Sequence, residues 1–169
     1  MSTSNARSGQ YATLRIAALL STAVVAVMVA ASPAAADPLK MVTVKGSFEN
    51  VRTDLQDAII NQGLKVDYNG KIGDMLKRTG ADVGSTKEIY TNAEYFTFCS
   101  SKLSRTMMEA DPGNVGMCPY MMFAYEAAGK PGEVTIGYRM LAARGDDASQ
   151  KALATINALL DTILKEASQ

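Results

Sequence analysis

The sequence predicts an α+β domain, in which helices pack on a single sheet of about five strands. Two observations lead to this fold class. Stretches in which apolar residues alternate with polar ones are separated by stretches in which apolar residues recur every three or four positions. Glycine, proline and asparagine, which favour turns, fall between these stretches. The resulting order is two strand-helix-strand units, a further strand and a C-terminal helix.

The first unit begins with residues 40–45, in which apolar and polar side chains alternate as in a strand. Ser47 is a suitable N-cap for the helix that follows. The apolar residues of this helix define one face: Phe48, Val51, Leu55 and Ile59. Gly63 falls where a C′ glycine ends a helix. Residues 64–68 then predict a second strand, closed by the Asn69-Gly70 turn signal.

A short helix over residues 72–78 and a surface loop over residues 81–91 lead into the second unit. Residues 93–98 (AEYFTF) are aromatic and typical of a strand. A serine, either Ser100 or Ser101, caps the next helix, which an Asp-Pro-Gly turn ends.

The last part of the chain carries the strand that we expect at the centre of the sheet. Residues 120–125 are apolar at both odd and even positions, which predicts a strand buried on both faces. A turn over residues 129–132 leads to a strand over residues 133–141, in which apolar side chains alternate. The final helix begins near Asp146-Asp147 and has one apolar stripe: Leu153, Ile156, Leu160 and Ile163.

The N-terminal segment, residues 1–36, predicts a secretory signal peptide. Basic residues precede an uncharged apolar run, and the small residues at Ala34 and Ala36 fit a cleavage site. The apolar run is shorter than the about 20 residues that span a bilayer, which disfavours the alternative of an uncleaved anchor. We therefore expect export, cleavage after Ala36, and one periplasmic or extracellular domain over residues 37–169.

The composition argues against several classes of protein. The sequence has no histidine, which removes the usual Ser-His-Asp catalysis and histidine metal sites. Its 17 basic and 17 acidic residues balance without a basic cluster, so nucleic-acid binding is not expected. No P-loop motif is present. After the signal peptide, no apolar run is long enough to span a bilayer, so no membrane attachment is expected after cleavage.

The stretch from Cys99 to Pro112 (CSSKLSRTMMEADP) resembles a signature of the domain of unknown function 302 family, in which a Cys-Asn-Pro opens a helix that ends in Asp-Pro. That family then has a Pro-Cys pair opening a strand that ends in Tyr-Glu, which Pro119 and Tyr125-Glu126 match. The resemblance covers residues 42–164. It implies an α+β fold, allows a homodimer, and carries no settled activity.

The chain departs from the family pattern beside both cysteines. Ser100-Ser101 stands where the family has Asn-Pro. If Pro119 and Tyr125-Glu126 set the alignment, Tyr120 occupies the second cysteine position of the family. Cys118 then lies two residues earlier.

Three interpretations stay open for Cys99 and Cys118. The first is a structural disulfide, because an exported chain usually oxidises its two cysteines to each other. Geometry limits this interpretation. If the intervening helix joined parallel strands, the cysteines would start at opposite ends of the sheet. Residues 111–117 would then have to return the chain over roughly 23 Å.

The second interpretation is thiol redox or sulfur-handling chemistry, since Cys99 directly precedes a helix N-terminus, where the helix dipole favours a thiolate. The third is a Cu(I) site, because thiolate and thioether ligands select Cu(I). Its ligands would be the two cysteines with Met117 and either Met121 or Met122. The alternative for these methionines is that they fill the core.

Other candidate site residues have ordinary structural alternatives. Lys102 and Arg105 near the start of the third helix could bind an anion with the help of helix N–H groups, or could be a solvated pair. Asp54 and Asp57 are expected on a solvated helix face. The strand tyrosines are expected mainly in the core rather than around a pocket: Tyr68, Tyr90, Tyr95, Tyr120, Tyr125 and Tyr138.

These observations favour an exported accessory or binding protein over an enzyme. Its partner, a protein or a small molecule, is not identified by the sequence, and no cofactor is required. A thiol redox or sulfur-handling protein that uses Cys99 and Cys118 is one alternative. A copper-binding module is the other.

Overall fold

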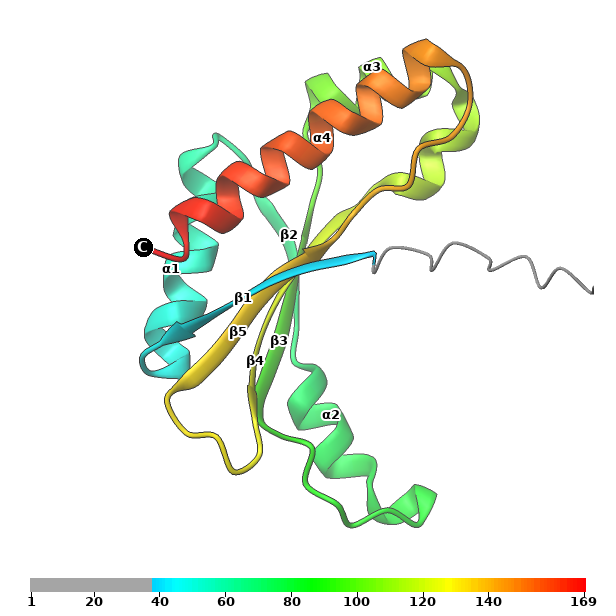
Figure 1. Cartoon of the computed structure of the whole chain (residues 1–169). Helices are drawn as coiled ribbons and strands as arrows, with labels where there is room; N and C mark the ends of the chain where they lie inside the picture. Colours follow the sequence, from blue (N-terminus) through cyan, green and yellow to red (C-terminus); the bar gives the residue numbers. More distant parts are fainter. Residues whose placement is uncertain (1–37) are drawn as a thin grey trace, which may run out of the picture. The chain divides into compact units, whose positions relative to one another are not determined.

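The structure is a computed structural model that describes residues 38–169 (Figure 1). The predicted signal peptide, residues 1–36, lies outside the described residues. The strands and α-helices are, in chain order, β1 (Leu39–Lys45), α1 (Phe48–Asn61), β2 (Val66–Gly70), α2 (Ile72–Thr79), β3 (Tyr90–Phe98), α3 (Ser101–Ala110), β4 (Tyr120–Ala127), β5 (Glu133–Arg139) and α4 (Asp147–Glu166).

The five strands form one antiparallel sheet in the order β1-β5-β4-β3-β2. The predicted α+β fold, a single sheet with helices packed on it, is therefore confirmed. β3 and β4 are antiparallel neighbours although α3 connects them. The end of β3 and the start of β4 consequently lie at the same end of the sheet. Among residues 38–169, no helix is both long and apolar enough to cross a membrane.

The boundaries of α1 follow from local signals in the sequence. The Ser47 hydroxyl accepts a hydrogen bond from the Asn50 backbone N–H at 3.3 Å, as expected of an N-cap. Gly63, at φ +72°, adopts the left-handed conformation that follows many helices. The predicted apolar stripe of α1 faces the sheet and is buried.

β2 covers residues 66–70 rather than the expected 64–68, so Asn69-Gly70 belongs to the strand and is not a turn. The reason is a contact between two residues that are far apart in the sequence. The Asn69 side-chain amide donates to Glu94 Oε2 of β3 at 2.9 Å, which keeps the chain paired with β3 up to Gly70.

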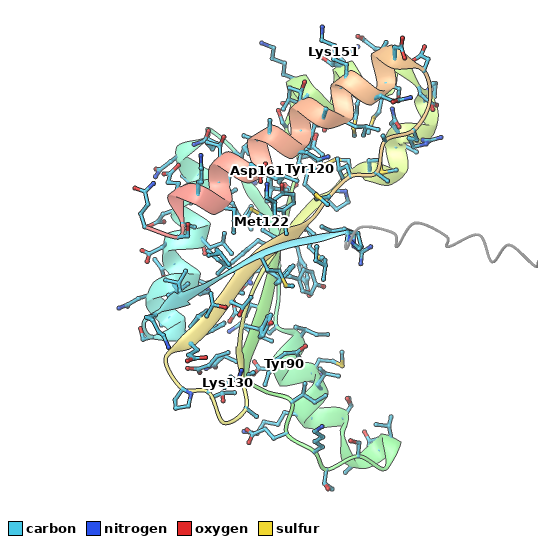
Figure 2. The ribbon with its side chains drawn as sticks, in the orientation of Figure 1. Tyr90, Tyr120, Met122, Lys130, Lys151 and Asp161 are labelled. Atoms are coloured by element: carbon cyan, nitrogen blue, oxygen red, sulfur yellow. A yellow bond between two sulfur atoms is a disulfide. The ribbon has the colours of Figure 1, made fainter. Side chains whose placement is uncertain are left out.

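The hydrophobic core lies between the sheet and the helices α1 and α4, which both pack on the same face (Figure 1). Burial of each large aliphatic side chain there contributes roughly 1.5–3 kcal/mol. Side chains from both layers form this core: Val51, Leu55, Ile59, Phe96, Met122, Ile136, Leu153, Ile156, Leu160 and Ile163. Figure 2 shows Tyr120 and Met122 on this helix-covered side of the sheet.

The prediction that residues 120–125 are buried on both faces is wrong. Burial alternates along β4: Tyr120, Met122, Ala124 and Glu126 are buried, whereas the odd-numbered residues between them are only half-buried. The strand is central in the sheet, but α1 and α4 cover one of its faces, so the other face keeps contact with solvent.

A buried asparagine connects α3 to α4. Asn114, in the 3-10 turn Pro112–Met117, is 0% exposed. Its amide N–H groups donate to a backbone carbonyl of α3 and to Ser149 Oγ, both at 2.8 Å, and its oxygen accepts from Arg144 at 3.1 Å. Arg144 also pairs with Asp111 at 3.2 Å. These bonds satisfy every polar atom of a fully buried side chain, as buried polar groups require.

Candidate functional site

The face of the sheet opposite α1 and α4 carries aromatic and methionine side chains that stay partly exposed. Strand register places these side chains on one surface, which we call the open face: Met41, Tyr68, Tyr95, Met121, Phe123 and Tyr125. Tyr68 is 59% exposed and Met41 44% exposed. The other four are half-buried. The described helix on this side is α2, whose Gly73 packs against Ala93 of β3.

The rings of the open face contact one another both across strands and along β4. The ring centroids of Tyr68 and Tyr95 are 6.0 Å apart, and those of Phe123 and Tyr125 are 6.3 Å apart. Tyr90, at the start of β3, meets the Tyr125 ring edge-on at 5.4 Å. Such pairs contribute about 0.5–1.5 kcal/mol beyond their buried area. The rings therefore form two groups, Tyr68 with Tyr95 and Tyr90 with Tyr125 and Phe123, and strand register places Tyr95 opposite Phe123.

Two glycines allow side chains of neighbouring strands to lie close to the backbone of this surface. A Cβ atom on Gly70 would overlap the Tyr95 ring, so this ring lies across the glycine of the neighbouring strand. A Cβ atom on Gly137 would stand 2.9 Å from Phe123 Cζ and 2.8 Å from Met41 Cγ. With a larger residue at either position, the neighbouring side chain or backbone would have to move.

Charged groups lie at the two ends of the open face and not at its centre. At one end, Lys45 Nζ and Glu133 Oε1 are 2.6 Å apart, and Lys45 lowers the pKa of Glu133 through this hydrogen bond and through its charge. At the other end of β5 lies the exposed side chain of Arg139. Between these ends, the hydroxyls of Thr43 and Thr135 are 3.1 Å apart.

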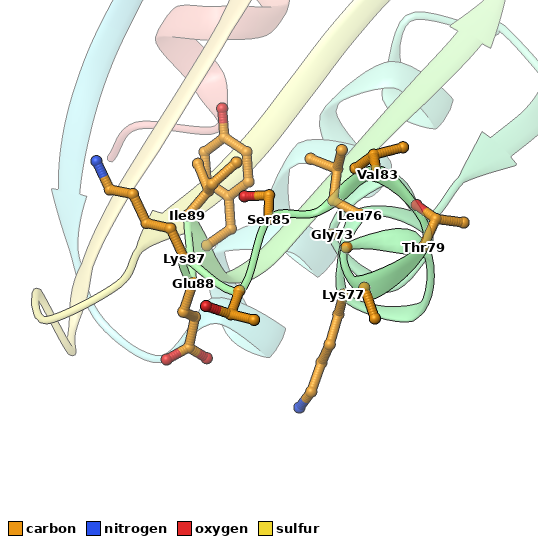
Figure 3. Close-up of a pocket in the computed structure, with 13 residues that line it drawn as sticks. Gly73, Leu76, Lys77, Thr79, Val83, Ser85, Lys87, Glu88 and Ile89 are labelled. Carbon is orange, nitrogen blue, oxygen red and sulfur yellow. The ribbon is translucent and has the colours of Figure 1, made fainter.

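A shallow pocket lies beside the open face, between α2 and the loop that follows it (Figure 3). Its volume is about 450 Å³, and its apolar lining comes from Leu76, Val83, Ile89 and Tyr90. Lys77 extends away from the pocket (Figure 3). Val83 is 75% exposed, so the pocket is an exposed apolar depression and not an enclosed cavity.

The expectation that the strand tyrosines lie mainly in the core is only partly correct. Tyr120 and Tyr138 are each 1% exposed. Burial and the hydrogen bond to Asp161, 2.7 Å away, raise the pKa of Tyr138 well above its usual range. The other four tyrosines lie on the side of the open face: Tyr68, Tyr90, Tyr95 and Tyr125. The sequence pattern missed this grouping because it does not say which face of a strand the helices cover.

Cys99 and Cys118 form a disulfide with a Cα–Cα distance of 6.2 Å. Phe98 pairs with Tyr120 in the antiparallel register, which brings the residues beyond these strand ends together. The parallel arrangement that would separate the cysteines does not occur. Both cysteines are half-buried, and the described residues contain no free cysteine.

Two hydroxyl groups lie beside the disulfide. The Ser104 hydroxyl lies 3.7 Å from Cys118 Sγ and 2.9 Å from the Tyr120 hydroxyl oxygen. Burial raises the pKa of Tyr120, and its hydrogen bond to Ser104 offsets only part of this rise. Sequence reasoning did not identify Ser104 as a neighbour of the cysteines. The sequence signal that could have placed Ser104 on the buried face of α3 is its position about one helical turn before Met107, which is also buried.

The structure separates the methionines that were considered as copper ligands. Met121 lies on the open face, whereas the neighbouring Met122 is 0% exposed in the core on the opposite face. Met117 is half-buried and packs against the core. In the disulfide, the sulfur atoms of Cys99 and Cys118 are bonded to each other, so a copper site that uses thiolates requires the reduced form.

The charged residues singled out in the sequence lie on exposed helix faces. Lys102 and Arg105 are exposed on α3, and Arg105 is paired with Glu109 of the same helix at 2.9 Å. Asp54 and Asp57 are exposed on α1, as expected of a solvated face. Anion binding by Lys102 and Arg105 stays a prediction.

The polar groups under α1 are paired with one another. Arg52 Nε lies 3.1 Å from Glu94 Oε2, and the Arg52 guanidinium lies 5.2 Å from the centre of the Phe96 ring. Asn69 completes this cluster through the bond to Glu94. Among residues 38–169, no buried side-chain nitrogen or oxygen lacks a hydrogen-bond partner, and no group of three His, Cys, Asp or Glu side chains is arranged to hold a metal ion.

The family model described as "Domain of unknown function DUF302" matches residues 40–167. The chain therefore belongs to this family, as the resemblance in the sequence indicated. A solved structure of an uncharacterized conserved DUF302 protein from Bacillus stearothermophilus has the same fold, with a TM-score of 0.65 and 15% sequence identity over 78% of this chain and 99% of that chain. No curated protein matches the sequence.

Proposed function

We propose that the chain is an exported, non-enzymatic accessory protein that acts by binding another protein through the open face. One observation carries this proposal: one sheet face bears aromatic and methionine side chains that are exposed or half-buried, while the opposite face of the same sheet is covered by helices. Soluble proteins rarely leave a contiguous apolar surface uncovered unless it is an interaction site. Tyrosine, phenylalanine and methionine are also the side chains enriched in protein interfaces.

The charge distribution supports binding rather than catalysis at this face. Its six defining side chains carry no charge at neutral pH, and the ionic groups at its ends are far from its centre in strand register. General acid–base chemistry needs titratable groups near a bound substrate. The open face offers rings and thioethers instead, which supply contact area.

Site-specific photo-crosslinking in cells that export the protein tests the proposal. Tyr68 is replaced by p-benzoylphenylalanine, because this residue is 59% exposed on the open face. Ile60, which is 48% exposed on α1, is replaced in a matched control. We expect a protein adduct at position 68 and none at position 60. Absence of an adduct at position 68, or equal adducts at both positions, would contradict the proposal.

Export is the second part of the proposal, and the intact mass of the protein recovered from the exported fraction tests it. We expect the mass of residues 37–169 with both cysteines oxidised. The Cys99–Cys118 disulfide supports this expectation, because disulfides form and persist mainly outside the cytosol. A full-length mass, or a protein found in the cytosolic fraction, would contradict it.

Thiol exchange at the disulfide is a second candidate function, favoured by the Ser104 hydroxyl beside Cys118 Sγ. A thiolate of a protein or small dithiol would attack Cys99 Sγ, form a mixed disulfide there, and release Cys118 as a thiolate. The Ser104 hydroxyl would then donate a hydrogen bond to that thiolate. Equilibration with a glutathione redox buffer tests this candidate: a Ser104→Ala variant should be harder to reduce than the unmodified protein. Equal equilibria would count against the exchange role.

Copper binding stays a third, separate proposal that concerns the reduced protein. Its ligands would be Cys99, Cys118, Met117 and Met121. Native mass spectrometry of the reduced protein with one equivalent of Cu(I) tests it. Retention of copper by the protein but not by a Met117→Leu variant would support the site, whereas equal retention by both would remove Met117 from the ligand set.

A further inference from the structure

The segment that begins with α2 has apolar side chains that its own chain covers only in part. We call residues 72–89 the arm. In the arm, Ile72, Met75 and Leu76 recur at three- and four-residue steps, yet α2 has no buried residue. Met75 is 37% exposed, and Val83 and Ile89, which follow in the arm, are 75% and 49% exposed. A helix of this length is not stable by itself, and its packing on β3 through Gly73 and Ala93 leaves part of its apolar surface open to a further contact.

The open face and the arm are therefore two uncovered apolar surfaces on the same side of one chain. From this geometry we infer that the partner of the open face is a second copy of the chain, with the arm of each copy covering the open face of the other. This inference rests on the proposed binding role of the open face and names its occupant. A two-fold axis makes such a contact self-complementary, because each copy contributes both surfaces.

The size of the open face agrees with a contact that also needs the arm. Five strands spaced about 4.8 Å apart, each with about seven residues at 3.3 Å, give a face of roughly 24 by 23 Å, or about 550 Å². Stable interfaces bury about 800 Å² on each partner. The face alone falls short of this value, so a stable contact needs further area, which the exposed apolar side chains of the arm would add.

Charge complementarity selects the orientation of the two copies. Arg139 and Glu133 lie at opposite ends of β5. If the two-fold axis lies in the plane of the sheet and perpendicular to the strands, each β5 lies over the β5 of the second copy with its direction reversed. Arg139 of each copy then faces the partner's Glu133, and Phe123 faces the partner's Tyr125. Arg139 thus meets a Glu133 carboxylate that already pairs with Lys45 of its own copy, and the uncharged centres stack.

The same axis places the arm over the most exposed ring of the open face. The arm extends from β3 near Ala93, toward the strand end at which β3 begins. Tyr68 lies on the neighbouring β2, opposite Thr97, toward the strand end at which β3 finishes. Because the two-fold axis reverses the strand direction, the end of one copy that carries the arm lies over the end of the other copy that carries Tyr68. The arm of one copy consequently covers the partner's Tyr68, and Tyr68 covers the apolar side chains of the arm.

Analytical ultracentrifugation of the exported protein tests this inference over a range of concentrations. We expect a dimer that a Tyr68→Glu variant converts to a monomer, because a carboxylate would be buried without a partner. An Ile60→Glu variant is the matched control, since it makes the same kind of change on the face of α1 and should stay dimeric. A monomeric unmodified protein, or a dimer that persists in Tyr68→Glu, would overturn the inference.

A charge-reversal experiment tests the orientation. In an Arg139→Glu homodimer, two acidic side chains meet at each end, and in a Glu133→Lys homodimer two basic side chains do. A one-to-one mixture of the two variants restores opposite charges at both ends. We expect each variant alone to dissociate at least tenfold more readily than the mixture. If the mixture dissociates as readily as either variant, the proposed orientation is incorrect.

The crosslinking experiment separates this inference from the proposed function. An adduct at position 68 with twice the mass of the chain supports both. An adduct with a different protein, together with a monomer in the centrifuge, overturns the second copy and leaves the open face as a binding surface. A monomer without any adduct overturns both.

Discussion

At the scale of single residues, two glycines determine the shape of the open face. Gly70 and Gly137 each lie under the side chain of a neighbouring strand, where a Cβ atom would collide. The two positions differ in what would have to move. At Gly70, the obstacle is the far end of the Tyr95 side chain, which can rotate away. At Gly137, one obstacle is the backbone carbonyl of Lys40, which belongs to the β1–β5 pairing and cannot move alone.

This difference gives a prediction for alanine substitutions. Gly137→Ala should lower the free energy of unfolding by about 1–3 kcal/mol, the usual range for overpacking. Gly70→Ala should have a smaller effect on stability but should change the tyrosine signal in the near-UV circular dichroism, because Tyr95 leaves its position. Gly116→Ala is the control, since a Cβ atom there meets nothing within 4 Å. Equal urea midpoints for Gly137→Ala and Gly116→Ala would contradict the prediction.

Asn114 is the residue whose loss should destabilise the α3–α4 connection most directly. Asn114→Ala removes three hydrogen bonds and leaves Ser149 Oγ buried without this partner, whereas the Met107 carbonyl keeps its bond from the Asp111 backbone N–H. We expect a loss of roughly 1–3 kcal/mol, because a buried polar group left unpaired costs about this much. Asn61→Ala, which removes an exposed bond to Glu166, should change stability by less than about 0.5 kcal/mol. Similar urea midpoints for the two variants would show that the buried bonds are not the cause.

At the scale of elements, the disulfide closes the segment that contains α3. Cys99 and Cys118 are 19 residues apart and join the end of β3 to the start of β4. β3 and β4 already pair along their length, so the bond adds a constraint where this pairing ends. The chain-entropy model assigns a closed loop of this size about 3 kcal/mol.

Reduction of the disulfide should therefore lower the urea midpoint without loss of the fold. We expect a loss of about 2–3 kcal/mol in the free energy of unfolding on reduction, with unchanged far-UV circular dichroism before the transition. The double variant Cys99→Ser, Cys118→Ser should match the reduced protein and should not respond to the reductant. If reduction leaves the midpoint unchanged, the bond has no structural role, and thiol exchange becomes its stronger explanation.

At the scale of the whole molecule, the sequence predicted what depends on local signals. The Ser47 cap and the periodic stripes of α1 and α4 are local, and the structure has both helices at the expected positions. The antiparallel pairing of β3 with β4, and with it the meeting of Cys99 and Cys118, depends on the topology of the entire sheet. The open face depends on both helices packing on one side. A strand such as Tyr120–Ala127 has the same sequence pattern whether one or both of its faces are covered.

The contact between α4 and the β1–β5 edge also depends on the assembled fold, and it should respond to pH. Asp161 of α4 accepts hydrogen bonds from Tyr138 at 2.7 Å and from Lys40 at 2.5 Å. Although burial acts to raise it, these bonds and the charge of Lys40 lower the pKa of Asp161 below its ordinary value of 3.8. The folded state thus holds the charged form more strongly than the unfolded state does. The resulting stability is present above about pH 4 and is lost as pH falls through the folded pKa.

Comparison with an Asp161→Asn variant isolates this contribution. The Asp161 side chain is 40% exposed, so screening by water limits the contribution to under about 1 kcal/mol. At pH 7, the variant should have the lower urea midpoint, because it lacks the carboxylate that Lys40 and Tyr138 bind. As pH falls below the folded pKa of Asp161, the midpoints should converge, because protonation gives the unmodified protein an equally uncharged side chain. A difference that stays constant from pH 7 to below the folded pKa would show that Asp161 acts through packing rather than through its charge.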